Sequence, residues 1–396
     1  MQIGIVGKPN VGKSTFFNGA TLASVEIANY PFTTIEANKG IAYLRTKCPH
    51  IEFKTDCTPN NSKCIEGIRY VPIEMIDVAG LVPGAHEGKG LGNKFLDDLR
   101  QADALIHIID ASGSTDSEGN PCPKGSHDPL DDVEFLENEI DLWFKSILSK
   151  NWRRISKRGR LEGTKLELLI LEQVTGLGIT REQVLHSLHK CSIQGNPEDW
   201  SEKELLRLAV TLRKISKPFI LGANKCDIAP TENLEKLTEL KDYTVIPAMA
   251  ELELALNNAT SAGLLIYNRG ESDFEVIDPS RLNEKQKKGL MTIRKHLQKW
   301  KRTGVQKCIE EAAYNLLDLI VVFPVEDENK LTDHEGRVLP DAYLMKKGTT
   351  ALDLAFKIHT DLGKHFIRAI DARTKRVVGK DHVLKHGDVI SIVSGK

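Results

Sequence analysis

The sequence predicts an α/β fold built on a parallel sheet, with a helical insertion and a small β-rich domain at the C-terminal end. Three observations lead to this prediction. A strand rich in β-branched residues, Ile3–Val6, runs into a glycine-bounded loop and then a helix, the unit from which parallel sheets are assembled. Two further apolar strands, 104–110 and 218–224, each end in polar residues. Much of the sequence between these two strands has helical periodicity, and short strands are predicted again from residue 319 onward.

Composition sets limits on the class of protein. The chain has 396 residues, 40% apolar and 28% charged, which suits a globular protein of two or three domains. Its net charge of −1 means that any nucleic-acid site must come from local clusters. Seven cysteines, an odd number, do not suggest a disulfide framework. No apolar run approaches the roughly 18 residues of a membrane span, and no signal segment is recognisable, so we expect a cytoplasmic protein without a membrane partner.

The loop after the first strand reads GKPNVGKS, from Gly7 to Ser14, and matches the P-loop pattern. Gly7 and Gly12 allow successive N–H groups to turn toward phosphate oxygens, and the following helix adds its positive end. We expect Lys13 to reach the outer phosphates and the Ser14 hydroxyl to bind Mg²⁺. The predicted nucleotide contacts come from Asn10, Val11, Gly12, Lys13, Ser14 and Thr15.

A second motif follows the apolar strand that ends at Asp77 and reads DVAG. An aspartate at this edge of a sheet can hold Mg²⁺ through water, and Gly80 can offer its N–H to the γ-phosphate. Thr34, with Thr33 as the alternative, is expected to close over the metal. Glycines 84, 88, 90 and 92 suit a segment that rearranges when the γ-phosphate leaves.

Leu81 stands where many nucleotide hydrolases carry a glutamine that orients the attacking water. We therefore expect slow intrinsic hydrolysis, or help from His86, Glu87, a K⁺ ion or a partner macromolecule. His107 lies within an apolar strand, where a hydrogen-bonded structural histidine is the first interpretation and a catalytic histidine the second.

The base is predicted by NKCD, residues 224–227. The Asp227 carboxylate can accept hydrogen bonds from N1–H and the exocyclic amine of guanine, neither of which adenine offers. Asn224 is expected to tether the loop, and Lys225 to lay its stem along the ring. Each charge-assisted hydrogen bond is worth about 1.5–3 kcal/mol, so the motif predicts GTP. Ala250 could present its N–H to the guanine carbonyl, although the preceding Met249 departs from the usual serine.

Together these motifs resemble the YchF branch of the Obg-type GTPases, and the likeness covers nearly the whole chain. It rests on GKPNVGKST, NYPFTTIEANKG, DVAGLVPGAHEGKGLGNKFL, NKCD and IHTDLGKHFIRA. The resemblance implies a nucleotide-controlled switch that binds ribosomes or RNA, an antiparallel helical arm, and a C-terminal TGS domain of the β-grasp type. Many members carry NxxE and prefer ATP, whereas Asp227 favours GTP here. ATP hydrolysis and an RNA-binding scaffold with a structural nucleotide site remain the alternatives. By analogy with cation-dependent GTPases, Asn10 could help to hold K⁺; otherwise it is a turn residue.

The predicted domains are the two parts of the nucleotide domain, 1–127 and 217–316, the helical insertion 128–216, and the TGS domain 317–396. Within the insertion, periodicity predicts four helices: Asp132–Lys150, Lys165–Thr175, Arg181–Lys190 and Glu202–Ser216.

Two basic runs are candidates for a ribosome or RNA contact. One holds seven cations between 145 and 160, interleaved with Trp143 and Trp152; the other, Lys285–Lys307, holds nine Lys or Arg and no acid. Solvated surface is the alternative for both. The TGS domain is a third candidate contact surface, or else a stabilising appendage.

One cluster fits none of these roles. Cys48, His50, Cys57 and Cys64 fall within 17 residues and could supply three thiolates and an imidazole to zinc. Because no CxxC pair is present, free thiols are the other interpretation.

Overall fold

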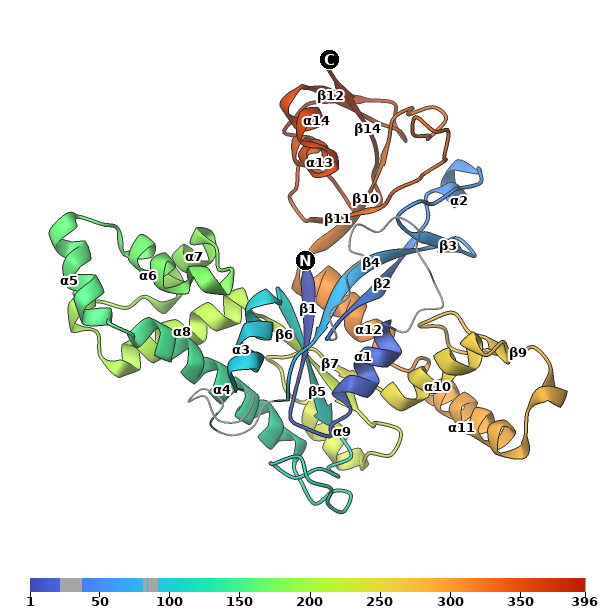
Figure 1. Ribbon diagram of the computed structural model, residues 1–396, viewed down its shortest axis with the longest axis horizontal. Helices are drawn as coiled ribbons and strands as arrows, with labels where there is room; N and C mark the ends of the chain where they lie inside the picture. Colours follow the sequence, from blue (N-terminus) through green and yellow to red (C-terminus); the bar gives the residue numbers. More distant parts are fainter. Residues whose placement is uncertain (22–37, 81–83, 85–91, 396) are drawn as a thin grey trace. The chain divides into compact units, whose positions relative to one another are not determined.

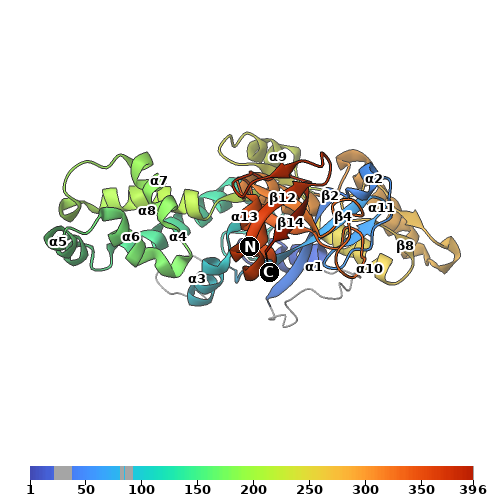
Figure 2. The same cartoon turned by 90° about the horizontal axis from the view of Figure 1, so that it is seen from above.

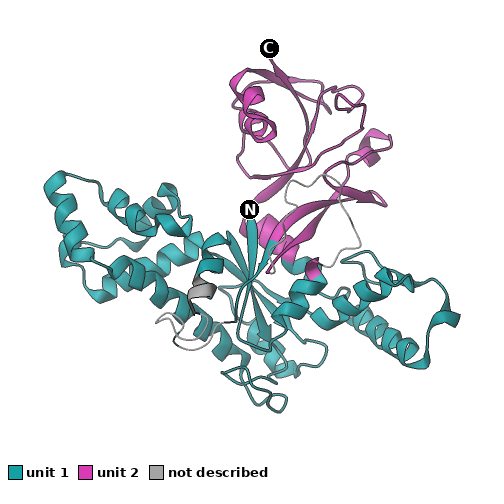
Figure 3. Cartoon of the chain, viewed as in Figure 1, with its two compact units in different colours: residues 1–19, 75–308 teal, residues 20–74, 309–396 magenta. Residues whose placement is uncertain are grey.

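The computed structural model describes residues 1–21, 38–80, 84 and 92–395 (Figure 1). It divides into two compact units: residues 1–19 with 75–308, and residues 20–74 with 309–396 (Figure 3). We call these unit 1 and unit 2. Several predicted residues lie outside the described part of the chain: Thr33, Thr34, Leu81, His86 and Glu87. The domain boundaries predicted from sequence cut the chain at other places and stay a prediction.

Unit 1 is built on a parallel sheet with the strand order β4-β1-β5-β6-β7. Its members are β1 (Gln2–Val6), β5 (Ala104–Asp110), β6 (Phe219–Asn224), β7 (Val245–Pro247) and the last residues of β4 (Ile68–Asp77). The interior strands are buried along their length, which explains their continuous apolar sequence. The register pairs Val6 with His107 and Asp110 with Asn224, so the carboxyl ends of β1, β5 and β6 meet at one edge. Ligands of open α/β sheets bind at this edge.

Helices follow these strands in the order expected for such a fold. They are α1 (Lys13–Thr21), α3 (Gly92–Gln101), α9 (Thr231–Thr238) and α10 (Ala250–Ser261). After α10 come a two-stranded sheet, β8 (Leu265–Ile266) with β9 (Glu275–Val276), and the helices α11 (Glu284–Trp300) and α12 (Val305–Glu310). Leu256, Phe274 and Leu297 belong to a small core of their own in this region.

The insertion contains five helices: α4 (Pro129–Ser149), α5 (Trp152–Glu162), α6 (Leu166–Val174), α7 (Arg181–Cys191) and α8 (Glu202–Ser216). The four predicted helices are confirmed to within three residues, and α5 was not predicted. Helix α8 packs against α4 and α7, and the five lie together (Figure 2). Their apolar side chains join the core of the sheet, so this arm has no separate core. None of the described helices is long and apolar enough to cross a membrane.

Unit 2 combines a hairpin-like extension with the C-terminal domain. The extension holds β2 (Lys39–Lys47), α2 (His50–Phe53), β3 (Lys63–Ile65) and most of β4. The C-terminal domain holds β10 (Leu319–Val325), β11 (Tyr343–Lys346), α13 (Ala351–Ile358), α14 (Thr360–Lys364), β12 (Phe366–Asp371), β13 (Val377–Val378) and β14 (Val389–Ser394). Its order, β11-β10-β14-β12-β13, with β10 parallel to β14 and α13 over the core, is that of the predicted β-grasp domain.

Candidate nucleotide-binding site

The loop between β1 and α1 needs glycine at two positions. Gly7 has φ +147°, and a Cβ there would lie 2.5 Å from the Ile108 carbonyl oxygen. Gly12 has φ +95°, and its Cβ would lie 2.4 Å from the Asn224 amide nitrogen. Both are closer than real Cβ contacts, so no other residue fits without movement. Helix α1 then begins with the hydrogen bond from Phe16 N–H to the Gly12 carbonyl, 2.8 Å.

Lys13 and Ser14 lie at the N-terminus of this helix. The Lys13 Nζ donates to the Lys8 carbonyl at 2.7 Å, and burial lowers its pKa to about 8 although Asp77 opposes the shift. A Cβ on Gly80 would lie 3.3 Å from this Nζ, so the DVAG segment borders the lysine. The Ser14 hydroxyl donates to Asp77 at 3.0 Å. The two residues predicted to hold Mg²⁺ are therefore together, and their hard oxygens suit that ion.

Asn10 stands in the left-handed conformation, φ +63°. Its Nδ2 donates to the Gly119 carbonyl at 2.9 Å, which draws the loop after β5 over the P-loop. Within the described residues its Oδ1 has no hydrogen bond. The side chain is exposed, so this oxygen can serve as a ligand for a monovalent cation.

The NKCD residues join three segments. Asn224 donates to the Val11 carbonyl at 2.9 Å and accepts from the Ala250 N–H at 3.0 Å. The Lys225 Nζ binds the Asp110 carboxylate at 2.7 Å and the Asn10 carbonyl at 3.3 Å. The Asp227 carboxylate is half-buried and makes no hydrogen bond or ion pair in the part of the chain that the structure describes. It is the unsatisfied acceptor of the motif.

The segment after β7 differs from the expectation. The Met249 side chain is buried, and its N–H donates to the Thr303 carbonyl at 2.7 Å. The Ala250 N–H is held by Asn224. The predicted contact from Ala250 to a guanine carbonyl would require that hydrogen bond to break. The next N–H group, on Glu251, lies in the first turn of α10 and so has no helical partner.

His107 is buried in β5, with its ring edge toward Phe219 at a centroid distance of 6.1 Å. Burial, followed by the charges of Lys13 and Lys8, lowers its pKa to about 3. An imidazole with this pKa stays neutral and is a poor proton acceptor, which disfavours the catalytic interpretation. Its buried Nδ1 has no hydrogen-bond partner among the described residues, so the expected hydrogen bond of a structural histidine is missing at that atom.

Two buried ionic contacts beside the P-loop, Lys225–Asp110 and Lys8–Asp132, were not predicted from the sequence. The Asp110 carboxylate is fully buried and accepts hydrogen bonds from the hydroxyls of Ser112, Ser114 and Thr115 as well as from Lys225. Burial alone would raise the pKa of Asp110, but hydrogen bonds from Lys225 and Ser112 lower it.

The second contact joins the Lys8 Nζ to Asp132, at 2.8 Å, and His127 shares the same carboxylate oxygen at 2.7 Å. Lys8 also donates to the Thr115 carbonyl, 2.8 Å away and 107 residues along the chain. Such separations leave no local pattern; the only signal in the sequence is the placement of Asp110 at the end of an apolar strand.

The first basic run lies in α4 and α5, and the expectation of interleaved aromatics is wrong. Trp143 and Trp152 are 4% and 3% exposed, and Trp152 stacks on Trp200 at 5.4 Å. Three of the cations form ion pairs: Lys145 with Glu202, Arg158 with Glu172 and Arg160 with Glu198. The exposed cations without an ion pair in the described residues are Lys150, Arg153, Arg154 and Lys157.

The second basic run forms α11 and the turn after it. Ile293 and Leu297 bury one side of the helix, and Arg294 pairs with Asp273 at 2.8 Å. The opposite side is exposed and carries Lys285, Lys288, Lys295 and Lys299, with Met291 at 73% exposure among them.

Comparison with known proteins agrees with this architecture. Three family models match: "50S ribosome-binding GTPase" over residues 2–138, "Obg-like GTPase YGR210-like, G4 motif-containing domain" over 222–327, and "TGS domain" over 335–394. A GTP-binding protein of Methanocaldococcus jannaschii is 55% identical over 99% of both chains. A protein of Bacillus subtilis named ribosome-binding ATPase YchF is 29% identical over 98% of both.

Among solved structures, a GTP-binding protein of Pyrococcus horikoshii matches the full length of both chains with a TM-score of 0.80 and 42% identity. The relative from M. jannaschii and this structure extend over the nucleotide domain, the arm and the C-terminal domain alike. The chain therefore belongs to the YchF-type, Obg-like family of P-loop GTP-binding proteins, with a C-terminal TGS domain.

Proposed function

We propose that this protein is a Mg²⁺-dependent GTPase that acts as a nucleotide-controlled switch on the ribosome or its RNA. The choice of guanine as the base rests on the hydrogen bonds made by the residues of the NKCD motif. Asn224 and Lys225 have all their polar contacts within the protein, whereas the half-buried Asp227 carboxylate has none among the described residues. A half-buried carboxylate gains most from a ligand that brings two donors, as the guanine edge does.

In this proposal each residue of the phosphate site has one task. Lys13 and the Gly80 N–H neutralise and orient the γ-phosphate, and Ser14 binds Mg²⁺ with Asp77 supporting it through water. Thr34 completes the metal site, in keeping with the sequence prediction. Val11, Gly12 and Thr15 contribute backbone and hydroxyl donors around the phosphates, and Glu251 N–H takes the guanine carbonyl in place of Ala250.

Turnover is expected to be slow without a partner, because Leu81 cannot orient water. Asn10 Oδ1 is the candidate ligand for K⁺, which would supply positive charge beside the phosphates. The proposal expects faster hydrolysis in KCl than in NaCl, measured as phosphate release, and a further increase with ribosomes. Equal rates in the two salts would remove the role of Asn10.

ATP hydrolysis is the second candidate, because the B. subtilis relative is named a ribosome-binding ATPase. Titration of the protein with GTP, ATP, GDP and ADP, followed by calorimetry, discriminates between the two. We expect GTP to bind more tightly than ATP by a factor on the order of 10³, since adenine would leave the Asp227 carboxylate unpaired. Tighter binding of ATP would reject the GTPase proposal and leave the ATPase.

A further inference from the structure

Unit 2 contains a compact group of sulfur and nitrogen atoms, from three cysteines and one histidine, that has no part in the proposed nucleotide chemistry. Cys48 follows β2, His50 begins α2, Cys57 lies in the loop after α2, and Cys64 lies in β3. Their three Sγ atoms and one imidazole nitrogen lie within 4.8 Å of one another. All three cysteines are free thiols.

Three of the six distances between these atoms are close to the edges of a zinc tetrahedron. With Zn–S near 2.3 Å and Zn–N near 2.0 Å, tetrahedral angles place two sulfurs about 3.8 Å apart, and sulfur and nitrogen about 3.5 Å apart. The Cys48 and Cys57 sulfurs are 3.9 Å apart. The His50 Nδ1 lies 3.3 Å from the Cys57 sulfur and 3.5 Å from that of Cys64. A disulfide would need sulfurs about 2.05 Å apart, well below the Cys48–Cys57 distance.

The charge around the group also fits a bound divalent cation. Arg69 is fully buried, and within the described residues no carboxylate pairs with it. Its guanidinium donates to the Cys48 sulfur at 3.2 Å, to Ser62 at 2.9 Å and to the Leu339 carbonyl at 2.9 Å. Three thiolates and one Zn²⁺ carry a net charge of −1, which a single guanidinium neutralises.

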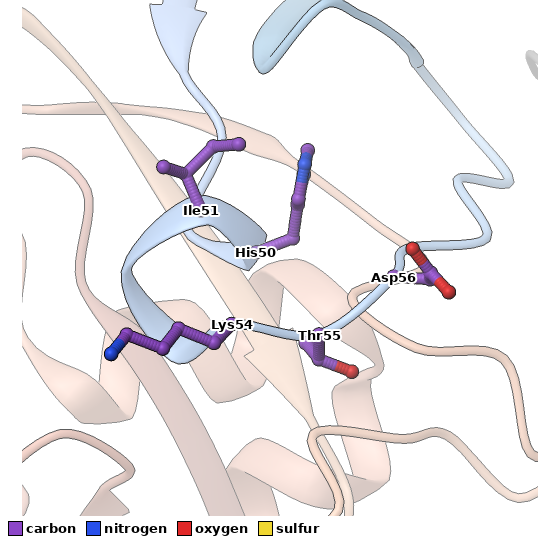
Figure 4. Close-up of a pocket in the computed structure, with 5 residues that line it drawn as sticks. All are labelled: His50, Ile51, Lys54, Thr55 and Asp56. Carbon is purple, nitrogen blue, oxygen red and sulfur yellow. The ribbon is translucent and has the colours of Figure 1, made fainter.

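A thiol gives up its proton when it coordinates zinc, so a bound ion would hold together three thiolates that otherwise repel one another. A shallow surface hollow is lined by His50, Ile51, Lys54, Thr55 and Asp56, so one residue of the group borders space open to solvent (Figure 4).

We propose that Cys48, His50, Cys57 and Cys64 form a structural zinc site. Four protein ligands close the coordination shell, so the ion would have no position for substrate and would act as a cross-link.

The cross-link would brace the loop that docks the extension onto the TGS domain. Thr58 N–H donates to the Val338 carbonyl at 2.9 Å, and Asn60 N–H to the Pro340 carbonyl at 2.7 Å. These contacts lie between two of the zinc ligands, Cys57 and Cys64. The ion would therefore fix the position of the TGS domain relative to the β2–β4 extension within unit 2.

The test is metal analysis of the full chain, made without a histidine tag in medium with trace zinc and purified without chelators. The expected result is one zinc per chain, falling to near zero in Cys57→Ser and in Cys64→Ser. Cys122→Ser is the matched control, because Cys122 is also a half-buried free thiol but lies outside the group; it should keep its zinc.

A Cys→Ser variant could lose zinc because it misfolds, so a second measurement is made on the unaltered protein. Replacement of the metal by Co²⁺ should give the strong thiolate-to-cobalt charge-transfer absorption and the visible bands of a tetrahedral site. Zinc near zero in the unaltered protein, even after exposure to zinc under reducing conditions, would overturn the proposal. So would zinc that survives loss of Cys57 and Cys64, or two thiols lost to a disulfide.

Discussion

Asp227 is the residue on which the choice of base depends in the proposed function. Replacing it by asparagine keeps its size but exchanges one acceptor oxygen for an amide donor. Guanine presents two donors at this edge, whereas xanthine presents one donor and one acceptor. We therefore expect Asp227→Asn to weaken GTP binding by roughly 100-fold or more, and to bind XTP more tightly than GTP.

Competition of GTP and XTP for a fluorescent nucleotide measures this exchange of preference. Asp242→Asn, at an exposed aspartate in unit 1, serves as the control and should leave both affinities unchanged. If Asp227→Asn keeps its preference for GTP, the carboxylate does not contact the base.

Lys13 makes the binding of the triphosphate depend on pH. Burial lowers the pKa of Lys13 to about 8 from an unperturbed 10.5, so the free protein loses this charge as the pH rises through 8. A bound triphosphate favours the charged form and raises this pKa. Affinity for GTP should thus be constant below pH 8 and fall above it, by up to about tenfold per pH unit.

Calorimetry between pH 7 and 9 in buffers of different ionisation enthalpy would detect the accompanying proton uptake. Lys13→Gln should bind GTP weakly, and its affinity should depend much less on pH. Deprotonation of the guanine base at high pH lowers the affinity of both proteins alike, so the comparison isolates the effect of Lys13. An identical pH profile in the two proteins would contradict the assignment to Lys13.

At the residue scale, contacts between neighbours in the sequence were predictable and distant ones were not. Gly7–Ser14 and NKCD are short runs in which the spacing itself encodes the geometry. The Lys225–Asp110 and Lys8–Asp132 pairs join residues more than 100 positions apart, so only the register of the sheet and the packing of α4 bring them together. The four residues of the proposed zinc site fall between these cases: they are close in sequence, but their spacing does not specify a tetrahedron.

At the scale of elements, periodicity predicted the helices that bury an apolar face. It missed α5 because five of the eleven residues of Trp152–Glu162 are basic, and its buried face consists of Trp152, Ile155, Ser156 and Gly159. A Cβ on Gly159 would lie 2.2 Å from the end of the buried Leu169 side chain, so any larger residue here would have to displace that leucine. The segment whose basic residues suggested a nucleic-acid contact therefore also has a face that packs against the protein.

The exposed face of α5 supports a sharper prediction about ribosome binding. Arg153, Arg154 and Lys157 are exposed and have no ion pair among the described residues, whereas Arg158 and Arg160 are each paired with a glutamate. Changing the three unpaired residues to glutamine should reduce co-sedimentation with ribosomes. It should also lower the salt dependence of binding, because fewer phosphates are neutralised and fewer counterions are released when the protein binds.

The matched control changes Arg158 and Arg160 to glutamine, which removes cations already neutralised by Glu172 and Glu198. This control should affect co-sedimentation less. Equal loss in both proteins would indicate a non-specific effect of charge, and no loss in either would place the ribosome contact elsewhere, with the exposed lysines of α11 as the next candidates.

At the scale of the whole molecule, the chain leaves the nucleotide unit early and returns to it. Residues 20–74 belong with 309–396, so unit 2 is assembled from segments more than 230 residues apart. Sequence patterns identified the TGS domain by its own strands, but they could not assign the β2–β4 extension to it. The hydrogen bonds of Tyr314 to the Arg45 carbonyl, 3.1 Å, and of Thr46 to His386, 2.8 Å, are among the contacts that join the two.

Arg69 is the residue whose loss should separate these segments. It is fully buried, donates to Ser62 and the Leu339 carbonyl, and lies over the Phe323 ring at 5.4 Å. Arg69→Met keeps much of the volume but leaves those acceptors without a donor, which should cost about 3 kcal/mol of unfolding free energy in unit 2. Hydrogen exchange at Thr58 and Asn60, whose N–H groups bind Val338 and Pro340, should accelerate by roughly 100-fold, since about 1.4 kcal/mol corresponds to a factor of ten.

GTP affinity should change little in Arg69→Met, because Lys13, Asn224 and Asp227 lie in unit 1 and, of the residues proposed to contact the nucleotide or Mg²⁺, Thr34 alone falls in the residue range of unit 2. Arg376→Met is the control: this arginine is exposed and its side chain has no hydrogen bond or ion pair among the described residues, so exchange at Thr58 and Asn60 should stay as in the unaltered protein. Unchanged exchange in Arg69→Met would mean that the extension is held to the TGS domain by its backbone contacts alone. Faster exchange together with weaker GTP binding would instead mean that the loss of Arg69 disturbs unit 1 as well.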